Sequence, residues 1–555
     1  LKGLPEKSKN KIQTAIEKQL TALDNGYEKI LSWAVNHKPT TIIISTVIFV
    51  LSLSLVKFIG TDFVPSSDNA MISGSFELPA GASVERSKAV AERFYGYMKQ
   101  TYPDEMIQMT YTVGTPADDS DNSFALMQTS GTNYVSYRIK FKPIKERDRT
   151  IFEIAELMRH EVESYPEVAK STVTAGGSSG MTSGSNIEVH IYGYDLEKTS
   201  KLASEFKEKM SQVPGLKDVS ISRKDYTPQY NIEFDREKLI ANGLNFSTAS
   251  TFVRNRMNGM TASLYREDGE EYKIKVRYAE EFRKSIEDIE NITLYSQTTG
   301  RPIKLSEVAK VVEKFAPPEI ERRNRERIVT VKATLFQTTI DKASAAIEDI
   351  KEDLSIPSGI SVDIGGSMED QQDTFGDMGL LAIIILILVY SVMAAEFESY
   401  TSPFIIMFSV PFALSGMFIS LWLTGQTMNL MSLIGAVMLI GIVVKNGIVL
   451  VDYINLNRER GLSIVTAIVA GGKSRLRPVL MTTATTILGM VPMALGIGEG
   501  SELWQPMGIV IVGGLLLSTL VTLVLIPTLY GSFAARRLNK DRKKLQKKIR
   551  KEAIA

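Results

Sequence analysis

The sequence has no cysteine and only 3 histidines among its 555 residues. The lack of thiols excludes disulfides, thiolate metal sites and a cysteine nucleophile, and three histidines leave little material for a histidine-based zinc or catalytic site. No phosphate-binding glycine loop, serine nucleophile elbow or metal-ligand spacing occurs either. The formal net charge is only +1, so the chain as a whole has no electrostatic attraction to nucleic acid. We therefore expect a protein that is not an enzyme and that uses no cofactor, metal or nucleic acid.

The chain also lacks an initiating methionine, because residue 1 is leucine, and no signal-peptide pattern follows it. We expect a fragment or a processed chain whose natural beginning is missing. The 44% hydrophobic composition averages two unlike materials. Long apolar runs lie near residue 40 and after residue 378, whereas the stretch between them is polar, which predicts a membrane part and a separate soluble part.

Six segments are long and apolar enough to cross a bilayer as helices, which takes about 20 residues. They are Thr40–Ile59, Met378–Ala395, Pro403–Leu423, Leu430–Tyr453, Pro478–Leu495 and Met507–Tyr530. Any one of them could instead be a buried helix of a soluble protein. Four of them within residues 403–530, joined by short connections, favour a membrane bundle.

Lysine and arginine mark the cytoplasmic side of a membrane protein. They gather before the first span, between the fourth and fifth spans, and in the tail 534–555. The loops on the opposite side, Gly425–Asn429 and Gly496–Trp504, contain neither residue. We therefore expect both termini in the cytoplasm and residues 61–377 on the extracytoplasmic side of a bacterial cytoplasmic membrane.

The segment 1–37, which precedes the first span at 38–60, carries a helical pattern of its own. From Ile12 to Trp33, apolar residues recur at helical spacing with lysine and glutamate between them. This pattern predicts an amphipathic helix that lies on the inner membrane surface. The alternative is a solvated linker helix.

The external part alternates predicted strands and helices in the β-α-β, β-α-β order of ferredoxin-like subdomains. One such subdomain is predicted at 61–184. A second combines 185–222 with 313–370 and is interrupted by an insert at 223–312. With five further spans in 371–533, the predicted fold class is a membrane α-helical bundle of six spans plus an extracytoplasmic α+β part.

Lys445 lies inside the fourth predicted span, about eight residues from its cytoplasmic end and therefore roughly 12 Å deep. An ionisable residue at such depth is costly and is a functional candidate, although snorkelling or a structural hydrogen bond is the alternative. A buried ammonium needs an anionic partner, and the only acid nearby in the span is Asp452, two turns away. We expect the missing carboxylate on another chain or another half of the protein.

Several long stretches, in the right order, resemble the C-terminal half of the resistance-nodulation-division (RND) efflux transporters, in the group that exports hydrophobic and amphiphilic compounds. The matching stretches are 63–83 (FVPSSDNAMISGSFELPAGAS), 227–243 (TPQYNIEFDREKLIANG), 396–416 (EFESYTSPFIIMFSVPFALSG), 441–455 (GIVVKNGIVLVDYIN) and 475–495 (RLRPVLMTTATTILGMVPMAL). Together they cover nearly the whole chain.

The resemblance implies a proton relay made by Lys445, Asn446, Thr482 and Arg475. In the family these residues face two adjacent aspartates on the N-terminal half, which is absent from this sequence. The two ferredoxin-like units correspond to the family's porter subdomains, and the insert corresponds to its docking subdomain. Such pumps work as homotrimers driven by the proton motive force, and some bind a periplasmic adaptor and an outer tunnel.

One stretch departs from the family pattern. The best-known drug exporters have a phenylalanine-rich loop after the strand at 106–113, whereas this sequence has an acidic loop with a single phenylalanine. The residues that we place on a substrate path here are Tyr111, Thr115, Phe124 and Met127. The methionines of this region, Met106, Met109 and Met127, are compatible with export of a soft metal, but methionine is also ordinary core filler.

The function expected from the resemblance is proton/substrate antiport of small amphiphilic compounds. Two other kinds of protein are kept open. The chain could be a scaffold that no longer transports, or an accessory subunit of protein translocation with a similar external fold. Heavy-metal efflux is a further alternative.

Overall fold

The computed structural model describes most of the chain. The described residues are 11–65, 67–79, 81–115, 131–176, 186–223, 227–296, 298, 300–316, 320–336, 338–498 and 500–552. They form two compact units, one made of the residues up to 222 together with those from 328 onward, and one made of residues 223–327.

Five helical segments in the described part of the chain are long and apolar enough to cross a membrane. They are Lys38–Phe58 (α2, Lys38–Leu55, with η1, Val56–Phe58), Ser367–Glu396 (α11), Thr401–Thr424 (α12, Thr401–Met407, with α13, Ser409–Thr424), Leu430–Glu459 (α14) and Gln505–Ala534, which belongs to α16 (Gln505–Glu552). The sixth predicted span, Pro478–Leu495, coincides with the second half of α15 (Ile464–Ala494). Four threonines and the three basic residues just before it make α15 less apolar than the others, so a count of six spans is not confirmed.

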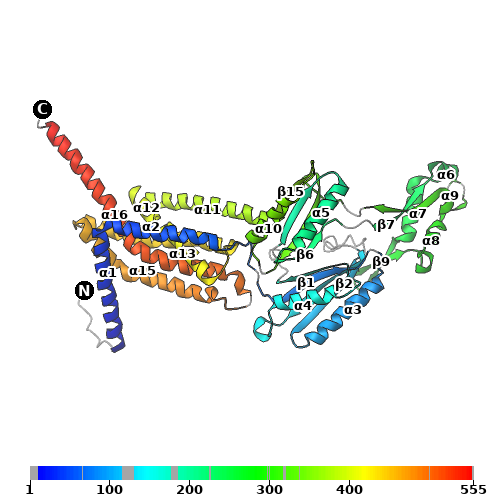
Figure 1. The fold of residues 1–555 in the computed structure, drawn as a ribbon, viewed down its shortest axis with the longest axis horizontal. Helices are drawn as coiled ribbons and strands as arrows, with labels where there is room; N and C mark the ends of the chain where they lie inside the picture. Colours follow the sequence, from blue (N-terminus) through cyan, green and yellow to red (C-terminus); the bar gives the residue numbers. More distant parts are fainter. Residues whose placement is uncertain are drawn as a thin grey trace. The chain divides into compact units, whose positions relative to one another are not determined.

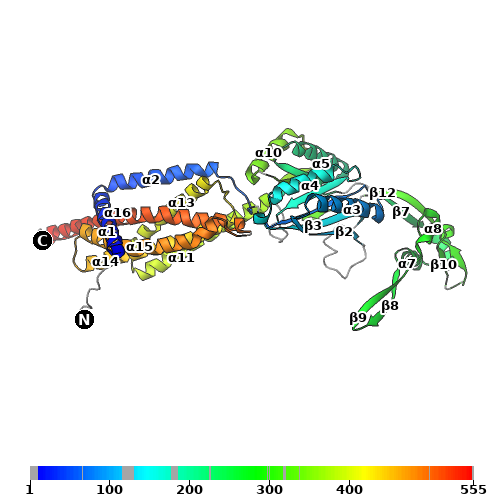
Figure 2. The ribbon, with the colours of Figure 1, turned by 90° about the horizontal axis from the view of Figure 1, so that it is seen from below.

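The helices of this bundle pack around α16, which contacts α13, α14 and α15 along much of its length (Figures 1 and 2). Glycines permit the close approach. A Cβ atom added to Gly513 would lie 2.3 Å from the side chain of Ser420, and one added to Gly514 would lie 2.1 Å from Leu439. Small residues serve in this way at helix contacts in membranes, where dispersion forces and not water exclusion hold helices together.

The first helix, α1 (Lys11–Asn36), packs on the bundle against α15 and α16. Asp24 pairs with Arg477 at 2.6 Å, and Glu28 pairs with Lys473 at 2.6 Å. The hydroxyl of Tyr27 donates a hydrogen bond of 2.8 Å to the carbonyl of Leu523. The apolar side chains of α1 divide between two faces: Leu31, Ala34 and Val35 are buried on the bundle, and Leu23, Ile30 and Trp33 are exposed.

The first α/β subdomain is a four-stranded antiparallel sheet of order β2-β3-β1-β4 with α3 and α4 on one face. Its elements are β1 (Met71–Glu77), α3 (Val84–Thr101), β2 (Met106–Thr115), β3 (Gly131–Phe141), η3 (Ile144–Glu146), α4 (Ile151–Glu163) and β4 (Lys170–Ala175). Ser83 caps α3, and Thr150 with Glu153 forms a capping box on α4. The alternating apolar residues of the strands, such as Ile72 and Phe76, are buried under the two helices.

The second α/β subdomain repeats this plan with strands from two distant parts of the chain. Its elements are β5 (Asn186–Tyr192), α5 (Leu196–Ser211), β6 (Leu216–Ile221), β14 (Glu326–Leu335), α10 (Ile340–Asp353) and β15 (Ser361–Gly366). The central strands β14 and β5 pair with each other, β6 pairs with β14, and β15 pairs with β5. Strand alternation buries Val189 and Val331 against α5 and α10.

Residues 223–327 form the second unit, which interrupts the second subdomain. Its elements are β7 (Thr227–Phe234), α6 (Arg236–Ala241), α7 (Phe246–Met257), β8 (Met260–Glu267), β9 (Glu270–Val276), η4 (Glu280–Phe282), α8 (Ile286–Glu290), β10 (Thr293–Tyr295), β11 (Pro302–Lys304), α9 (Leu305–Val308), β12 (Ala309–Ala316) and β13 (Arg322–Arg323). The predicted insert ends at residue 312, whereas the unit continues to 327. The reason is that β12 pairs with β7 over its whole length, from Ala309 opposite Phe234 to Ala316 opposite Thr227.

Candidate proton relay and intersubdomain cleft

Lys445 lies in the middle of α14, and its side chain is exposed on the surface of the bundle. Among the described residues, no carboxylate lies within 4.0 Å of its ammonium group. Asp452, the acid nearest to it along the helix, is also exposed and makes no ion pair there. A charged group on a lipid-facing helix surface is costly unless an acid or water meets it. The position therefore needs a partner that this part of the chain does not supply.

Asn446, the next residue, is turned by about 100° around α14 from Lys445 and reaches into the bundle. Its amide donates to the hydroxyl of Thr483 on α15 at 3.4 Å, and that hydroxyl lies 3.2 Å from the hydroxyl of Thr519 on α16. Thr483 and Thr519 are both buried. Three helices are thus joined by a short chain of polar groups in an apolar interior, where unpaired polar atoms would be costly.

Thr482, the predicted relay threonine, is exposed, and its hydroxyl donates to the carbonyl of Val479 on its own helix at 2.9 Å. Thr482 therefore lies on the exposed surface of the bundle, whereas Thr483 makes the hydrogen bond with Asn446. The sequence does not distinguish these two threonines, because Thr482, Thr483, Thr485 and Thr486 together surround most of the helix. Thr519 was not predicted, because a threonine in an apolar helix most often bonds to its own backbone.

Arg475 lies near the start of the apolar half of α15. Its guanidinium carbon lies 4.5 Å above the ring of Tyr453, and its Nε atom is buried without a hydrogen-bond partner. The neighbouring basic residues, Lys473 and Arg477, are held by acids of α1. Of these three cations, Arg475 is the one that no carboxylate in the described chain engages, so it remains a candidate for the relay on geometric grounds.

The predicted substrate-path residues divide into three groups. Tyr111 packs against the core of the first subdomain, with its ring 6.1 Å from that of Tyr95 on α3. Thr115 is the last residue of β2, and its side chain lies outside the described atoms. Phe124 and Met127 lie outside the described residues. The methionines Met106 and Met109 pack against the same core as Tyr111, which is the ordinary structural role of methionine.

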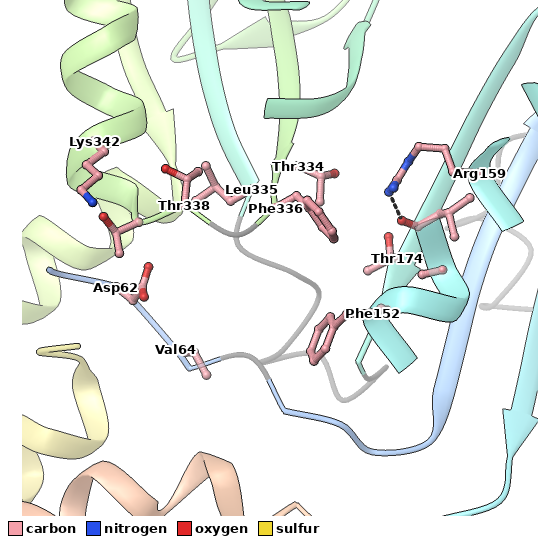
Figure 3. A pocket seen from close by; sticks show the side chains of 14 residues that line it. Asp62, Val64, Phe152, Arg159, Thr174, Thr334, Leu335, Phe336, Thr338 and Lys342 are labelled. Carbon is pink, nitrogen blue, oxygen red and sulfur yellow. Dashed lines mark hydrogen bonds between the residues drawn. The ribbon is translucent and has the colours of Figure 1, made fainter. Parts of the chain in front are cut away.

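A cleft of about 250 Å³ opens between the two α/β subdomains (Figure 3). Its lining residues are Asp62, Val64, Phe152, Ala155, Arg159, Val173, Thr174, Ala175, Thr334, Leu335, Phe336, Thr338, Thr339 and Lys342. Apolar rings and aliphatic chains alternate with hydroxyls and a few charges. A lining of this kind suits a compound that has both an apolar body and a polar group.

The three charged side chains on the cleft wall differ in whether other protein groups already bind them. Arg159 is committed to the protein, because its guanidinium binds both carboxylate oxygens of Asp218, at 2.9 and 3.1 Å, and pairs with Glu156. Lys342 is exposed on α10. Asp62 lies on the segment that links α2 to the first subdomain, and burial raises the pKa of its carboxyl to about 6.

A metal centre is not evident in the described chain. No group of three or more histidine, aspartate or glutamate side chains is placed to hold an ion there. The sequence contains no cysteine that could add a thiolate.

Comparison with known proteins identifies the class to which this bundle and its external subdomains belong. A family model described as the AcrB/AcrD/AcrF family matches residues 1–534, so the chain is a member of this family of RND transporters. Its members are transporters and not enzymes, which agrees with the sequence-based expectation.

Individual relatives place the chain more closely. It is 30% identical over 542 residues to the swarming motility protein SwrC of Bacillus subtilis, covering 97% of this chain and 49% of that protein. It is 27% identical over 536 residues to the multidrug resistance protein MdtC of Escherichia coli, covering 95% of this chain and 50% of MdtC. The crystal structure of a heavy metal efflux pump superposes with a TM-score of 0.74 at 26% identity, over 93% of this chain and 52% of the pump. The chain thus spans about half the length of each of these relatives.

Proposed function

We propose that this chain acts as the C-terminal half of a proton-driven RND exporter of small amphiphilic compounds, a proton/substrate antiporter in the bacterial cytoplasmic membrane. The observation that carries the proposal is Lys445, an exposed ammonium in the middle of a membrane helix that no carboxylate in the described chain meets. Membership of the RND family and the half-length match to its relatives support a second half that supplies the acids.

The relay operates through charge pairing on the open face of α14. Acids from the other half pair with Lys445 when they are ionised, and a bound proton removes that attraction. Helix α14 then shifts, and the contacts of Asn446 with Thr483 and Thr519 transmit the movement to α15 and α16. Thr482 contributes a hydroxyl to the same open face. Arg475 contributes a cation at the cytoplasmic end of that face.

Substrate moves through the intersubdomain cleft and not past Lys445. The cleft has the mixed lining that amphiphiles need, and α11 continues from β15 of the second subdomain directly into the membrane bundle. A homotrimer with the large domain outside the membrane, and an adaptor and tunnel where an outer membrane exists, complete the proposed assembly.

Replacing Lys445 tests the relay. The Lys445→Ala variant is expected to lose export of a fluorescent amphiphile from energised cells, by at least tenfold in initial rate, with an unchanged amount of protein in the membrane. Lys57→Gln is the matched control. Lys57 is also an exposed lysine, but it lies in η1 at the end of the first membrane segment and not in the middle of a membrane helix. Unimpaired export by Lys445→Ala would contradict the relay, and absence of export by the unmodified protein would favour the scaffold or translocation alternatives.

Heavy-metal export remains a second candidate because the pump with TM-score 0.74 carries that name. Metal-dependent growth protection by the unmodified protein, without protection against amphiphiles, would support it. The packing of Met106 and Met109 in the subdomain core gives it no further support.

A further inference from the structure

The short segment 60–63 ties the end of a membrane helix to the external domain. Two backbone hydrogen bonds join this segment to Met428. The Met428 N–H donates to the carbonyl of Gly60 at 2.8 Å, and the Asp62 N–H donates to the carbonyl of Met428 at 3.1 Å. Leu430, the first residue of α14, donates its N–H to the carbonyl of Phe63 at 3.2 Å. The helix that carries Lys445 therefore begins in direct contact with this segment.

The same segment also holds the start of α10 in the second subdomain. Thr61 N–H donates to Oδ1 of Asp341 at 3.4 Å. A Cβ atom added to Gly60 would lie 2.9 Å from the side chain of Thr339, so only glycine permits this approach. Thr339 is the N-cap residue of α10 but makes no capping hydrogen bond, and the Ile340 N–H instead faces the carboxylate of Asp62. The side chain of Asp62, from a distant segment, thus satisfies a free backbone N–H at the start of α10.

The surroundings of the Asp62 carboxylate disfavour its charge. Among the described residues, no basic side chain forms an ion pair with it. From α10, Asp341 faces it with a like charge, and Lys342 is exposed to solvent in the cleft. From the loop between α13 and α14, which has no titratable residue, Thr427 offers a hydroxyl. The cation on the far wall, Arg159, donates a hydrogen bond of 3.0 Å to the carbonyl of Val173 (Figure 3). It is also held by Asp218 and Glu156.

Each neighbour shifts the proton affinity of Asp62 in a defined direction. Burial is the largest influence and raises the pKa of this carboxyl to about 6, Thr427 and the Ile340 N–H lower it, and Asp341 raises it. The hydroxyl oxygen of Thr339 is buried beside the segment and has no hydrogen-bond partner. A neutral carboxyl keeps acceptor capacity for the Ile340 N–H and the Thr427 hydroxyl, so these contacts persist when the carboxyl binds a proton and loses its charge.

We propose that Asp62 is a proton-binding site at the junction between α14 and α10, and that its neutral form holds the two helices together. We call the junction closed when the segment 60–63 contacts both α10 and α14, as it does here. Because the half-buried carboxyl of Asp62 has a higher pKa than one in water, proton binding favours the closed junction. The closed form is fully favoured below the ordinary pKa of aspartate, near 4, and this preference is lost as the pH rises through about 6. A difference of about two pKa units corresponds to a change on the order of 100-fold in the equilibrium between the closed and open junction.

The role of this site in transport rests on the proposed function, which puts the junction on the side of the membrane from which protons enter. A proton bound to Asp62 there would tie α10 to α14, and its loss would let the external subdomain move without the membrane helix. Asp62 is thereby a coupling residue. It does not take part in the relay at Lys445, because Asp62 lies beyond the end of a membrane helix and Lys445 lies in the middle of one.

These 555 residues contain no cysteine, so cysteines introduced into them are the only thiols of this part of the protein available for labelling. Spin labels on Thr424→Cys and Glu352→Cys, two exposed positions at the end of α13 and on α10, report the distance across it by electron spin resonance in lipid nanodiscs. The unmodified junction is expected to give one narrow distance distribution at pH 4.5 and a broader, longer one at pH 7.5. The Asp62→Asn variant, which keeps the shape and is always neutral, is expected to stay narrow at both pH values.

Matched variants make the assignment specific. Asp104→Asn, at an exposed acid of the first subdomain, is expected to behave as the unmodified protein. Thr427→Val, which removes a group that stabilises the charge, is expected to increase the open population at pH 7.5, and Asp341→Asn, which removes a like charge, is expected to reduce it. The proposal is overturned if the distance distribution does not change with pH, or if Asp62→Asn changes with pH as the unmodified protein does.

The same labels separate this proposal from the proposed function. Lys445→Ala in the labelled protein is expected to abolish export while leaving the pH response of the junction in place. If export persists in that variant, the relay fails and the junction stands. If export needs Lys445 but the junction does not respond to pH, the relay stands and the role of Asp62 fails.

Discussion

Lys445 and Asn446 are adjacent in α14 and have opposite surroundings. Successive residues of a helix are turned by about 100°, so one can face the bundle while the next faces outward. Asn446 reaches Thr483 inside the bundle, and Lys445 remains on its surface. The pair can therefore position α14 through one side chain and sense an external charge through the other.

The two neighbouring threonines of α15 are expected to separate stability from transport. Thr483→Val leaves the Asn446 amide and the Thr519 hydroxyl without their partner, and we expect a loss of about 1–2 kcal/mol in stability, seen as a lower melting temperature in detergent. Thr482→Val removes only a bond to its own helix backbone and is expected to leave stability within about 0.5 kcal/mol. If Thr482 serves the relay, this variant also loses export at an unchanged melting temperature; a large destabilisation by Thr482→Val would contradict the arrangement.

The candidate relay could be predicted only in part at the level of residues. Lys445 is identifiable from sequence because a charge in an apolar helix is costly wherever the helix packs. The choice between Thr482 and Thr483 was not available, since it depends on how α15 is rotated against α16. Strand alternation places Tyr111 on the same core face as Met109 and Val113, where its ring lies near Tyr95. No periodicity argument reveals the register shift between Met106 and Gln108, which lets Met106 face the same core.

At the level of elements, α1 is held to the bundle by two ion pairs and a buried tyrosine. The sequence predicts its amphipathic pattern, but one apolar face covers α15 and α16 and the other remains exposed. A helix with two apolar faces fits between a bundle and a lipid surface. Gly472 is part of this contact, because an added Cβ would lie 2.6 Å from Leu31 and 2.8 Å from the Tyr27 hydroxyl.

Breaking one ion pair is expected to loosen α1. Arg477→Gln leaves Asp24 largely buried without its cation, which we expect to cost about 1 kcal/mol or more and to raise hydrogen exchange in α1 selectively. Lys88→Gln is the control, since its pair with Glu92 at 3.7 Å is exposed on both sides and is worth less than about 0.5 kcal/mol. Equal exchange in α1 for both variants would show that the apolar contacts alone hold the helix.

The elements themselves were predictable where their periodicity is strong. The membrane helices and the two β-α-β halves have long regular patterns and clear caps, such as Ser83 and Thr150. The end of the insert was not predictable, because β12 has the same alternating pattern as a strand of the subdomain and only its pairing with β7 assigns it. The second half of α15 is likewise ambiguous, since its threonines weaken the apolar signal while tertiary packing keeps it helical.

At the level of the whole molecule, the bundle has surfaces that the described part of the chain does not cover. Only 6% of the apolar window of α11 and 17% of that of α2 is buried, against 61% for α16. Lipid can cover aliphatic surface, but it does not satisfy the exposed ammonium of Lys445. The chain spans about half the length of its relatives, and under the proposed function a second set of helices with acidic residues covers this surface.

The most direct test of this account is a zero-length cross-link at Lys445. A membrane-permeant carbodiimide joins an amine only to a carboxylate in contact with it, and mass spectrometry of the purified complex identifies the joined peptide. The account predicts that Lys445 is linked to an aspartate or glutamate in an apolar peptide outside these 555 residues. A link to Asp452 alone, or no link at Lys445 while other contacting pairs such as Lys473 and Glu28 are joined, would contradict it.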